Sequence, residues 1–149
     1  MKTKMITLCT ITMVGLLLAF AMMNIGTSTK ISGILSHGVQ IMFNRLGDAE
    51  YTIYEIDFMV RKIGHFVFYA LLSTMIAIIL FKKFNKLYLS VVLSSVATLT
   101  LAFMDEFIQH YAKGRNASVF DIVIDMAGAA MGLLIFSVTV WVIDKKEQG

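Results

Sequence analysis

Four stretches of almost uninterrupted apolar sequence constrain the fold of this chain more than any other feature. They cover residues 5–23, 63–81, 87–104 and 119–143. An α-helix needs about 20 mostly apolar residues to cross the hydrocarbon core of a bilayer. The 149-residue chain is also 58% hydrophobic and only 15% charged, whereas soluble domains average about 45–50% apolar and 25% charged residues. The sequence therefore predicts an all-α integral membrane protein with four transmembrane helices, in a single domain over 1–149.

The first stretch has a second interpretation. Lys2 and Lys4 precede an apolar core, and Ala19-Phe20-Ala21 has the small-x-small pattern of a signal-peptide cleavage site. The apolar run is longer than the about 7–15 residues of a signal h-region, which favours a retained membrane helix. Cleavage would leave three spans.

The distribution of charge predicts how the chain is oriented. With the N-terminus inside, the inner loops and termini carry seven basic and two acidic residues, and the outer segments carry six basic and eight acidic ones. The inner side is then about +5 and the outer side about −2, as the positive-inside rule requires. We therefore expect a multi-pass protein with both termini in the cytoplasm.

The segment 24–60 between the first two spans is expected outside and is only partly polar. Its apolar residues recur at helical spacing and include Ile31, Ile34, Leu35, Met42, Phe43 and Leu46. This pattern predicts an amphipathic helix in the plane of the membrane interface. Tyr51, Tyr54 and Phe58 continue the segment, and tyrosine is favoured at headgroup depth. The segment is either a lid over the outer ends of the spans or a surface anchor.

Ten polar or charged residues, which we call the polar cluster, occur at the ends of the last three spans that face outside in this topology. They are Arg61, Lys62, His65, Tyr69, Asp105, Glu106, Gln109, Arg115, Asp121 and Asp125. The inner ends carry mostly isolated lysines. Asp125 lies about 9 Å along its helix from Val119. An ionised group at that depth needs a cationic partner or a wet cavity.

Small residues share the helix face of two of these acids. Asp121, Asp125, Gly128 and Gly132 fall within a narrow arc of the fourth span, and the two glycines form a GxxxG match. Small residues let a neighbouring helix backbone approach closely. We therefore expect the packed face of this helix to carry the two aspartates.

Structural roles account for several of these residues without any ligand. Ser118-x-x-Asp121 fits a capping box, and Arg61 and Lys62 fit interfacial anchors. The acids Asp105 and Glu106 lie at a helix end where the macrodipole disfavours negative charge. A static salt-bridge network with Arg61 and Arg115 would be sufficient reason for them.

The ordered set of motifs resembles the VanZ-like family of bacterial membrane proteins. The matching blocks are Arg61-Lys62-x-x-His65-x-x-x-Tyr69, Asp105-Glu106-x-x-Gln109, Gly114-Arg115 and Asp121-x-x-x-Asp125-x-x-Gly128. They cover about 61–132, and the residues before them match only as an apolar span plus a polar segment. The resemblance implies a small four-helix protein of the bacterial cell membrane that reduces susceptibility to teicoplanin and related lipid-tailed glycopeptides.

Three functions of different classes fit the polar cluster. In the first, it binds an amphiphile, either a lipid-tailed antibiotic or an envelope lipid, and Arg61, Lys62 and Arg115 hold its phosphate or carboxylate. In the second, the protein is an enzyme that modifies a lipid-linked envelope precursor. In the third, the cluster is structural and the protein scaffolds a partner.

The candidate catalytic residues of the enzyme hypothesis are His65 as general base and Asp105 or Glu106 as the acid that orients it. Carboxylates are also the ligands that hard divalent cations prefer. However, no motif of a known metal site or nucleophile is present, so we expect no metal and no cofactor. The single cysteine, Cys9, excludes an intrachain disulfide. Basic residues form no stripe, so nucleic acid is not an expected partner.

Overall fold

The computed structural model describes residues 2–22, 25–46, 52–112 and 118–148. Over these residues the chain forms five helices and no strand. The helices are α1 (Lys2–Met22), α2 (Ile25–Leu46), α3 (Ile53–Phe84), α4 (Leu87–Tyr111) and α5 (Val119–Gln148). This confirms the all-α prediction, and α2 is the predicted additional helix between the first two spans.

Helices α1, α3, α4 and α5 are each long and apolar enough to cross a membrane. Their outer faces expose large apolar side chains such as Leu71, Phe103 and Leu134. A soluble protein rarely leaves so much apolar surface in contact with water, whereas lipid tails are a suitable environment for it. The chain is a multi-pass membrane protein with four membrane helices.

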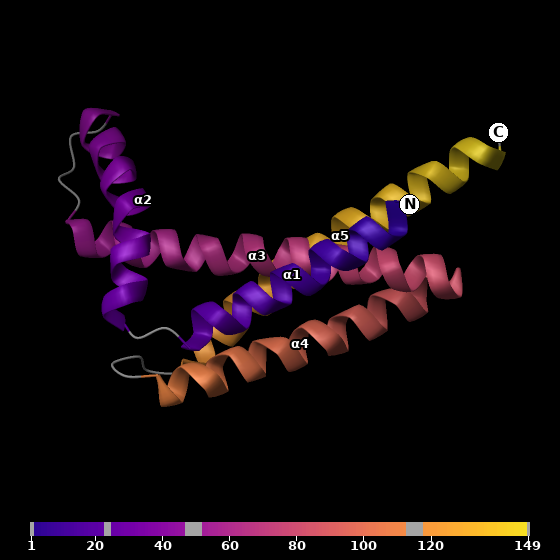
Figure 1. Ribbon diagram of the computed structural model, residues 1–149. Coiled ribbons are helices and arrows are strands. Elements are labelled where there is room, and N and C mark those ends of the chain that lie inside the picture. Colours follow the sequence, from indigo (N-terminus) through magenta and orange to yellow (C-terminus); the bar gives the residue numbers. More distant parts are fainter. Residues whose placement is uncertain (1, 23–24, 47–51, 113–117, 149) are drawn as a thin grey trace.

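The membrane helices pack around the pair formed by α3 and α5, which share the most extensive contact in the molecule. Helix α4 packs against both members of this pair, and α1 lies against α3 and α4 (Figure 1). Helix α2 packs on α3 but runs across its beginning instead of along it (Figure 1). If α3 crosses the bilayer, this orientation places α2 near the membrane plane, as its amphipathic sequence predicts.

Helix α3 begins at Ile53, ten residues before the predicted apolar span. Its start is fixed by a capping box, in which the Glu55 N–H donates to Thr52 Oγ1 and the Thr52 N–H donates to Glu55 Oε2. Helix α4 likewise continues to Tyr111, beyond the predicted end at residue 104. Hydropathy detects the apolar part of a helix, while backbone hydrogen bonding continues through polar residues. Much of the polar cluster therefore lies on regular helix.

Two glycines bring α5 into backbone contact with α3. A Cβ at Gly128 would lie 2.1 Å from the carbonyl oxygen of Phe66, and one at Gly132 would lie 2.1 Å from that of Ala70. The Ser73 hydroxyl donates to the Ala129 carbonyl at 3.0 Å in the same contact. The close approach expected from the GxxxG spacing is confirmed.

A buried stripe of small and polar residues forms the inner face of α4. Ser90, Ser94, Thr98 and Ala102 recur every fourth residue and are all buried. The Ser94 hydroxyl donates to the Ser73 carbonyl on α3 at 2.7 Å. Small residues and interhelical hydrogen bonds are the usual means of helix association in membranes. This stripe leads along α4 directly to Asp105.

Candidate polar site

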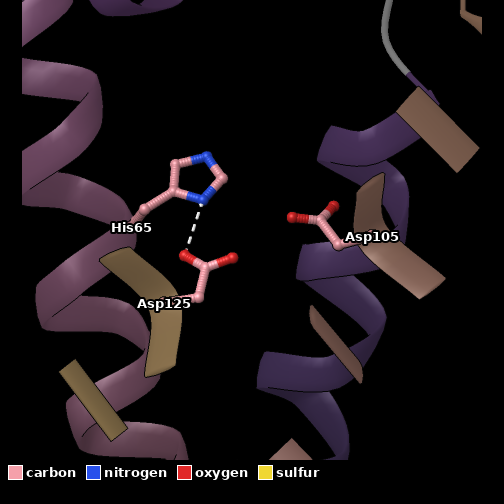
Figure 2. Close-up of side chains that lie close together, drawn as sticks. All are labelled: His65, Asp105 and Asp125. Atoms are coloured by element: carbon pink, nitrogen blue, oxygen red, sulfur yellow. Dashed lines mark hydrogen bonds and ion pairs between the residues drawn. The ribbon is translucent and has the colours of Figure 1, made fainter. Parts of the chain in front are cut away.

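Three side chains from three helices converge at the end of the bundle where α3 begins and α4 ends. His65 comes from α3, Asp105 from α4 and Asp125 from α5 (Figure 2). His65 Nδ1 lies 3.0 Å from Asp125 Oδ1, and the carboxylate of Asp105 faces this pair across a short gap (Figure 2). One potential ligand atom from each residue lies within 4.8 Å of the others. Of the ten residues of the polar cluster, His65, Asp105 and Asp125 are therefore brought together in space.

Local helix geometry explains why Asp125 meets His65. Asp125 precedes Gly128 by one turn on the packed face of α5, where the backbones of α3 and α5 touch. The Asp125 side chain is fully buried, and Asp105 is only 1% exposed. The acid in contact with His65 is thus Asp125, instead of the Asp105 or Glu106 suggested by the sequence.

Two cationic side chains near the triad, Lys62 and Arg61, form ion pairs with acids outside it. Lys62 Nζ forms an ion pair with Asp121 Oδ1, which joins α3 to α5. Arg61 pairs with Asp57 one turn earlier on α3, with Nη2 and Nε at 2.8 and 2.9 Å from Oδ2. The ion pair of Arg61 is thus with an acid on its own helix. The network predicted for the acids at the end of α4 also includes Arg115, which lies outside the described residues.

Asp57 is a site residue that sequence reasoning missed. Its Oδ1 accepts a hydrogen bond from Ser36 Oγ on α2 at 3.0 Å, while its Oδ2 holds Arg61. Ser36 is completely buried. The four-residue spacing of Asp57 and Arg61 was the available signal for their pairing. This contact fastens the transverse helix α2 to the beginning of α3.

Glu106 caps the start of α5 through a hydrogen bond to the backbone. Its Oε2 accepts a hydrogen bond from the backbone N–H of Ser118 at 2.7 Å. The first N–H groups of a helix lack partners within the helix, and a carboxylate there also interacts favourably with the macrodipole. The capping-box interpretation of Ser118 and Asp121 is accordingly wrong, because Glu106 receives this N–H and Asp121 pairs with Lys62.

Several buried polar atoms in this region lack a hydrogen-bond partner in the part of the chain that the structure describes. The Tyr69 hydroxyl, Glu106 Oε1 and Asp125 Oδ2 have no hydrogen-bond partner among those residues. Tyr69 is completely buried one turn beyond His65 on α3, and Gln109 is buried one turn beyond Asp105 on α4. Buried polar groups normally have a partner. The region therefore has the capacity to bind additional polar groups or an ion.

Arg115, the last member of the polar cluster, lies outside the described residues.

A cavity of about 300 Å³ adjoins the site on the side of α1 and α2. Its lining consists of Leu17, Phe20, Ser32, Leu35, Val60, Arg61, Gly64, His65, Phe68 and Tyr69. Most of these side chains are apolar, and Arg61, His65 and Tyr69 place polar groups on the α3 wall. His65 belongs to both the cavity and the site. The sequence did not predict this cavity, because it depends on where α2 lies.

The comparison with known protein families agrees with the motif pattern. The VanZ/LLP1 family matches the chain over residues 6–141. No match was found among curated proteins or among solved structures. The family match extends from α1 to α5 and includes every residue of the polar cluster. The chain belongs to the VanZ/LLP1 family, a family of membrane proteins linked to glycopeptide resistance.

Proposed function

We propose that this protein resides in the bacterial cell membrane and lowers susceptibility to teicoplanin-type lipid-tailed glycopeptides by binding an amphiphile. The amphiphile is either the antibiotic itself or an envelope lipid. The observation that carries this proposal is the apolar cavity between α1, α2 and α3, which has Arg61 and His65 in its wall. Ligand pockets are typically concave, mostly apolar and furnished with a few convergent polar groups.

The two parts of an amphiphile match the two parts of this region. An acyl tail that enters the membrane gains about 0.8 kcal/mol for each CH₂ group that leaves water, and the apolar lining of the cavity is a suitable environment for such a tail. Arg61 is 27% exposed, so its guanidinium remains accessible although it pairs with Asp57. A guanidinium has five N–H donors, and Asp57 uses two of them. A guanidinium in this position suits a phosphate or carboxylate head group, which it can bind through charge-assisted hydrogen bonds.

The proposed orientation places both termini in the cytoplasm and the polar cluster at the outer surface. The charge difference between the two sides of the membrane supports it. Lys82, Lys83, Lys145 and Lys146 lie at the ends of α3 and α5 that are opposite the polar cluster. An amphiphile carried in the outer leaflet would then reach the cavity laterally.

A cavity-filling variant tests the proposal. Gly64 lines the cavity, and a Cβ added there meets no atom within 4 Å, so the side chain of Gly64→Leu starts in open space. Gly15→Leu on α1 is the matched control, because Gly15 has equally open surroundings and does not line the cavity. In a susceptible Gram-positive host, Gly64→Leu should abolish the protection against teicoplanin that the unchanged protein and Gly15→Leu provide. Full protection by Gly64→Leu would contradict a role for the cavity.

A second candidate function is modification of a lipid-linked envelope precursor with His65 as general base. The contact between His65 Nδ1 and Asp125 Oδ1 favours it, since a base oriented by a carboxylate is a common catalytic arrangement. Incubation of the purified protein with a lipid-linked precursor, followed by mass spectrometry, distinguishes the two candidates. Enzymatic activity requires a change of precursor mass that His65→Gln abolishes, whereas a binding protein leaves the mass unchanged.

A further inference from the structure

The triad of His65, Asp105 and Asp125 has the composition of a metal site, and its potential ligand atoms lie close together. One imidazole nitrogen and two carboxylate oxygens, each from a different helix, lie within 4.8 Å of one another. His65 Nδ1 and Asp125 Oδ1 are 3.0 Å apart, and Asp105 faces them across the gap in Figure 2. Ligand atoms of a tetrahedral Zn²⁺ lie about 3.4 Å from one another. A side-chain shift of roughly 1–1.5 Å by Asp105 would close the set around one ion.

Burial and charge give an independent reason to expect a cation. Asp105 is 1% exposed and the Asp125 side chain is fully buried, with Asp125 Oδ2 lacking a partner among the described residues. The neighbouring cations Lys62 and Arg61 form ion pairs with Asp121 and Asp57. A buried carboxylate oxygen such as Asp125 Oδ2 is costly unless a hydrogen bond or positive charge compensates it. A divalent ion would supply that charge at the centre of the triad.

We propose that His65, Asp105 and Asp125 bind one divalent transition-metal ion of the Zn²⁺ class. Carboxylates alone would suit Mg²⁺ or Ca²⁺, but the imidazole shifts the preference towards Zn²⁺ and similar ions. Three protein ligands leave a fourth position open, which is typical of zinc sites that act on a bound group. Tyr69 lies one turn from His65 on α3, and its buried hydroxyl has no hydrogen-bond partner among the described residues.

The metal site goes beyond the proposed function and does not depend on it. An ion at the triad would give the neighbouring cavity a second anchor for a phosphate or carboxylate head group, since His65 belongs to both. In this state His65 is a ligand, which excludes it as a general base. Metal binding is measured without any amphiphile, so its failure and the failure of antibiotic protection are separate results.

The test uses the full chain, purified in detergent with an affinity tag that contains no histidine. Co²⁺ replaces Zn²⁺ as a spectroscopic probe, and Zn²⁺ is then added as a competitor. We expect visible absorption bands of coordinated Co²⁺ that saturate at one ion per chain and disappear on addition of Zn²⁺. Asp125→Asn, Asp105→Asn and His65→Gln should each weaken binding by about tenfold or more.

Two matched controls lie outside the triad. His110→Gln replaces an exposed histidine on α4, and Asp144→Asn replaces an acid towards the other end of α5. Both should bind Co²⁺ like the unchanged protein. Circular dichroism identifies any triad variant that does not fold. Co²⁺ binding is then compared between the folded triad variants and the unchanged protein. Absence of Co²⁺ bands from the unchanged protein, or binding that all folded triad variants retain, would overturn the proposal.

Discussion

His65 Nδ1 on α3 and Asp125 Oδ1 on α5 lie 3.0 Å apart, one helical turn from the point where the two backbones touch at Gly128. The position of the acid beside the histidine therefore depends on a residue that has no side chain. A Cβ at Gly128 would approach the Phe66 carbonyl oxygen to 2.1 Å, a distance that forces the helices apart. Packing and site geometry are coupled at this contact.

We predict that Gly128→Ala destabilises the protein by about 1–3 kcal/mol, the usual cost of inserting a methyl group into a tightly packed contact. Gly15→Ala should not be destabilising, because a Cβ there meets no atom within 4 Å. Thermal unfolding of the purified proteins in detergent, followed by circular dichroism, measures the difference. Equal stability of the two variants would show that α3 and α5 do not approach this closely.

Much of this packing was accessible from the sequence. Length and hydropathy predict the membrane helices because a bilayer requires about 20 apolar residues per span. The spacing of Asp125, Gly128 and Gly132 places them on one helix face regardless of what packs there. Both predictions depend only on the geometry of a single helix.

The partners between helices could not be predicted in the same way. One residue along a helix changes the direction of a side chain by 100° and its depth by 1.5 Å. The sequence therefore suggests Asp105 or Glu106 as the partner of His65, whereas the relative rotation of α3 and α5 in the structure makes Asp125 the partner. Ser36 reaches Asp57 because α2 crosses the start of α3, and no sequence pattern specifies which residues of the two helices meet there.

The contact of Arg61 with Asp57 leads to a second prediction about stability. Arg61→Ala should cost about 1–2 kcal/mol, because it removes charge-assisted hydrogen bonds from an acid that also holds α2. Lys30→Ala, at an exposed position on α2, should change stability by less than about 0.5 kcal/mol. The same unfolding measurement compares them. If both substitutions are tolerated equally, Arg61 is only an interfacial anchor.

Glu106 offers a prediction about the junction between α4 and α5. Glu106→Ala removes the acceptor for the Ser118 N–H and should cost about 1–2 kcal/mol, like the loss of a helix cap. Glu106→Gln retains an acceptor oxygen and should recover at least half of this loss. Unfolding in detergent again provides the comparison. An Ala variant as stable as the Gln variant would mean that the hydrogen bond does not support the start of α5.

The proposed orientation predicts which positions are accessible from outside the cell. In a Cys9→Ser background, His37→Cys on α2 should react with a membrane-impermeant thiol reagent on intact cells. Asn85→Cys, between α3 and α4, should react only after permeabilisation. Both positions are exposed in the structure, so access through the membrane is the variable that separates them. The opposite pattern would place the polar cluster in the cytoplasm.

The last prediction combines the family with the geometry of the site. Expression in a susceptible Gram-positive host should lower susceptibility to teicoplanin more than to vancomycin, because vancomycin has no acyl tail to carry it into the membrane interface. Protection should also require the polar cluster, so the variants below should weaken it while the protein still reaches the membrane. They are Asp105→Asn, Glu106→Gln, Arg115→Ala and Asp125→Asn.

Lys146→Ala, at the other end of α5, is the control and should protect fully. Glu106→Gln is the most informative variant, because it keeps an acceptor for Ser118 while removing a negative charge from the site. Weak protection by a stable Glu106→Gln protein would assign this acid a function beyond capping α5. Equal protection against both antibiotics would exclude tail-dependent partitioning, and full protection by all four variants would leave a scaffolding role for the cluster.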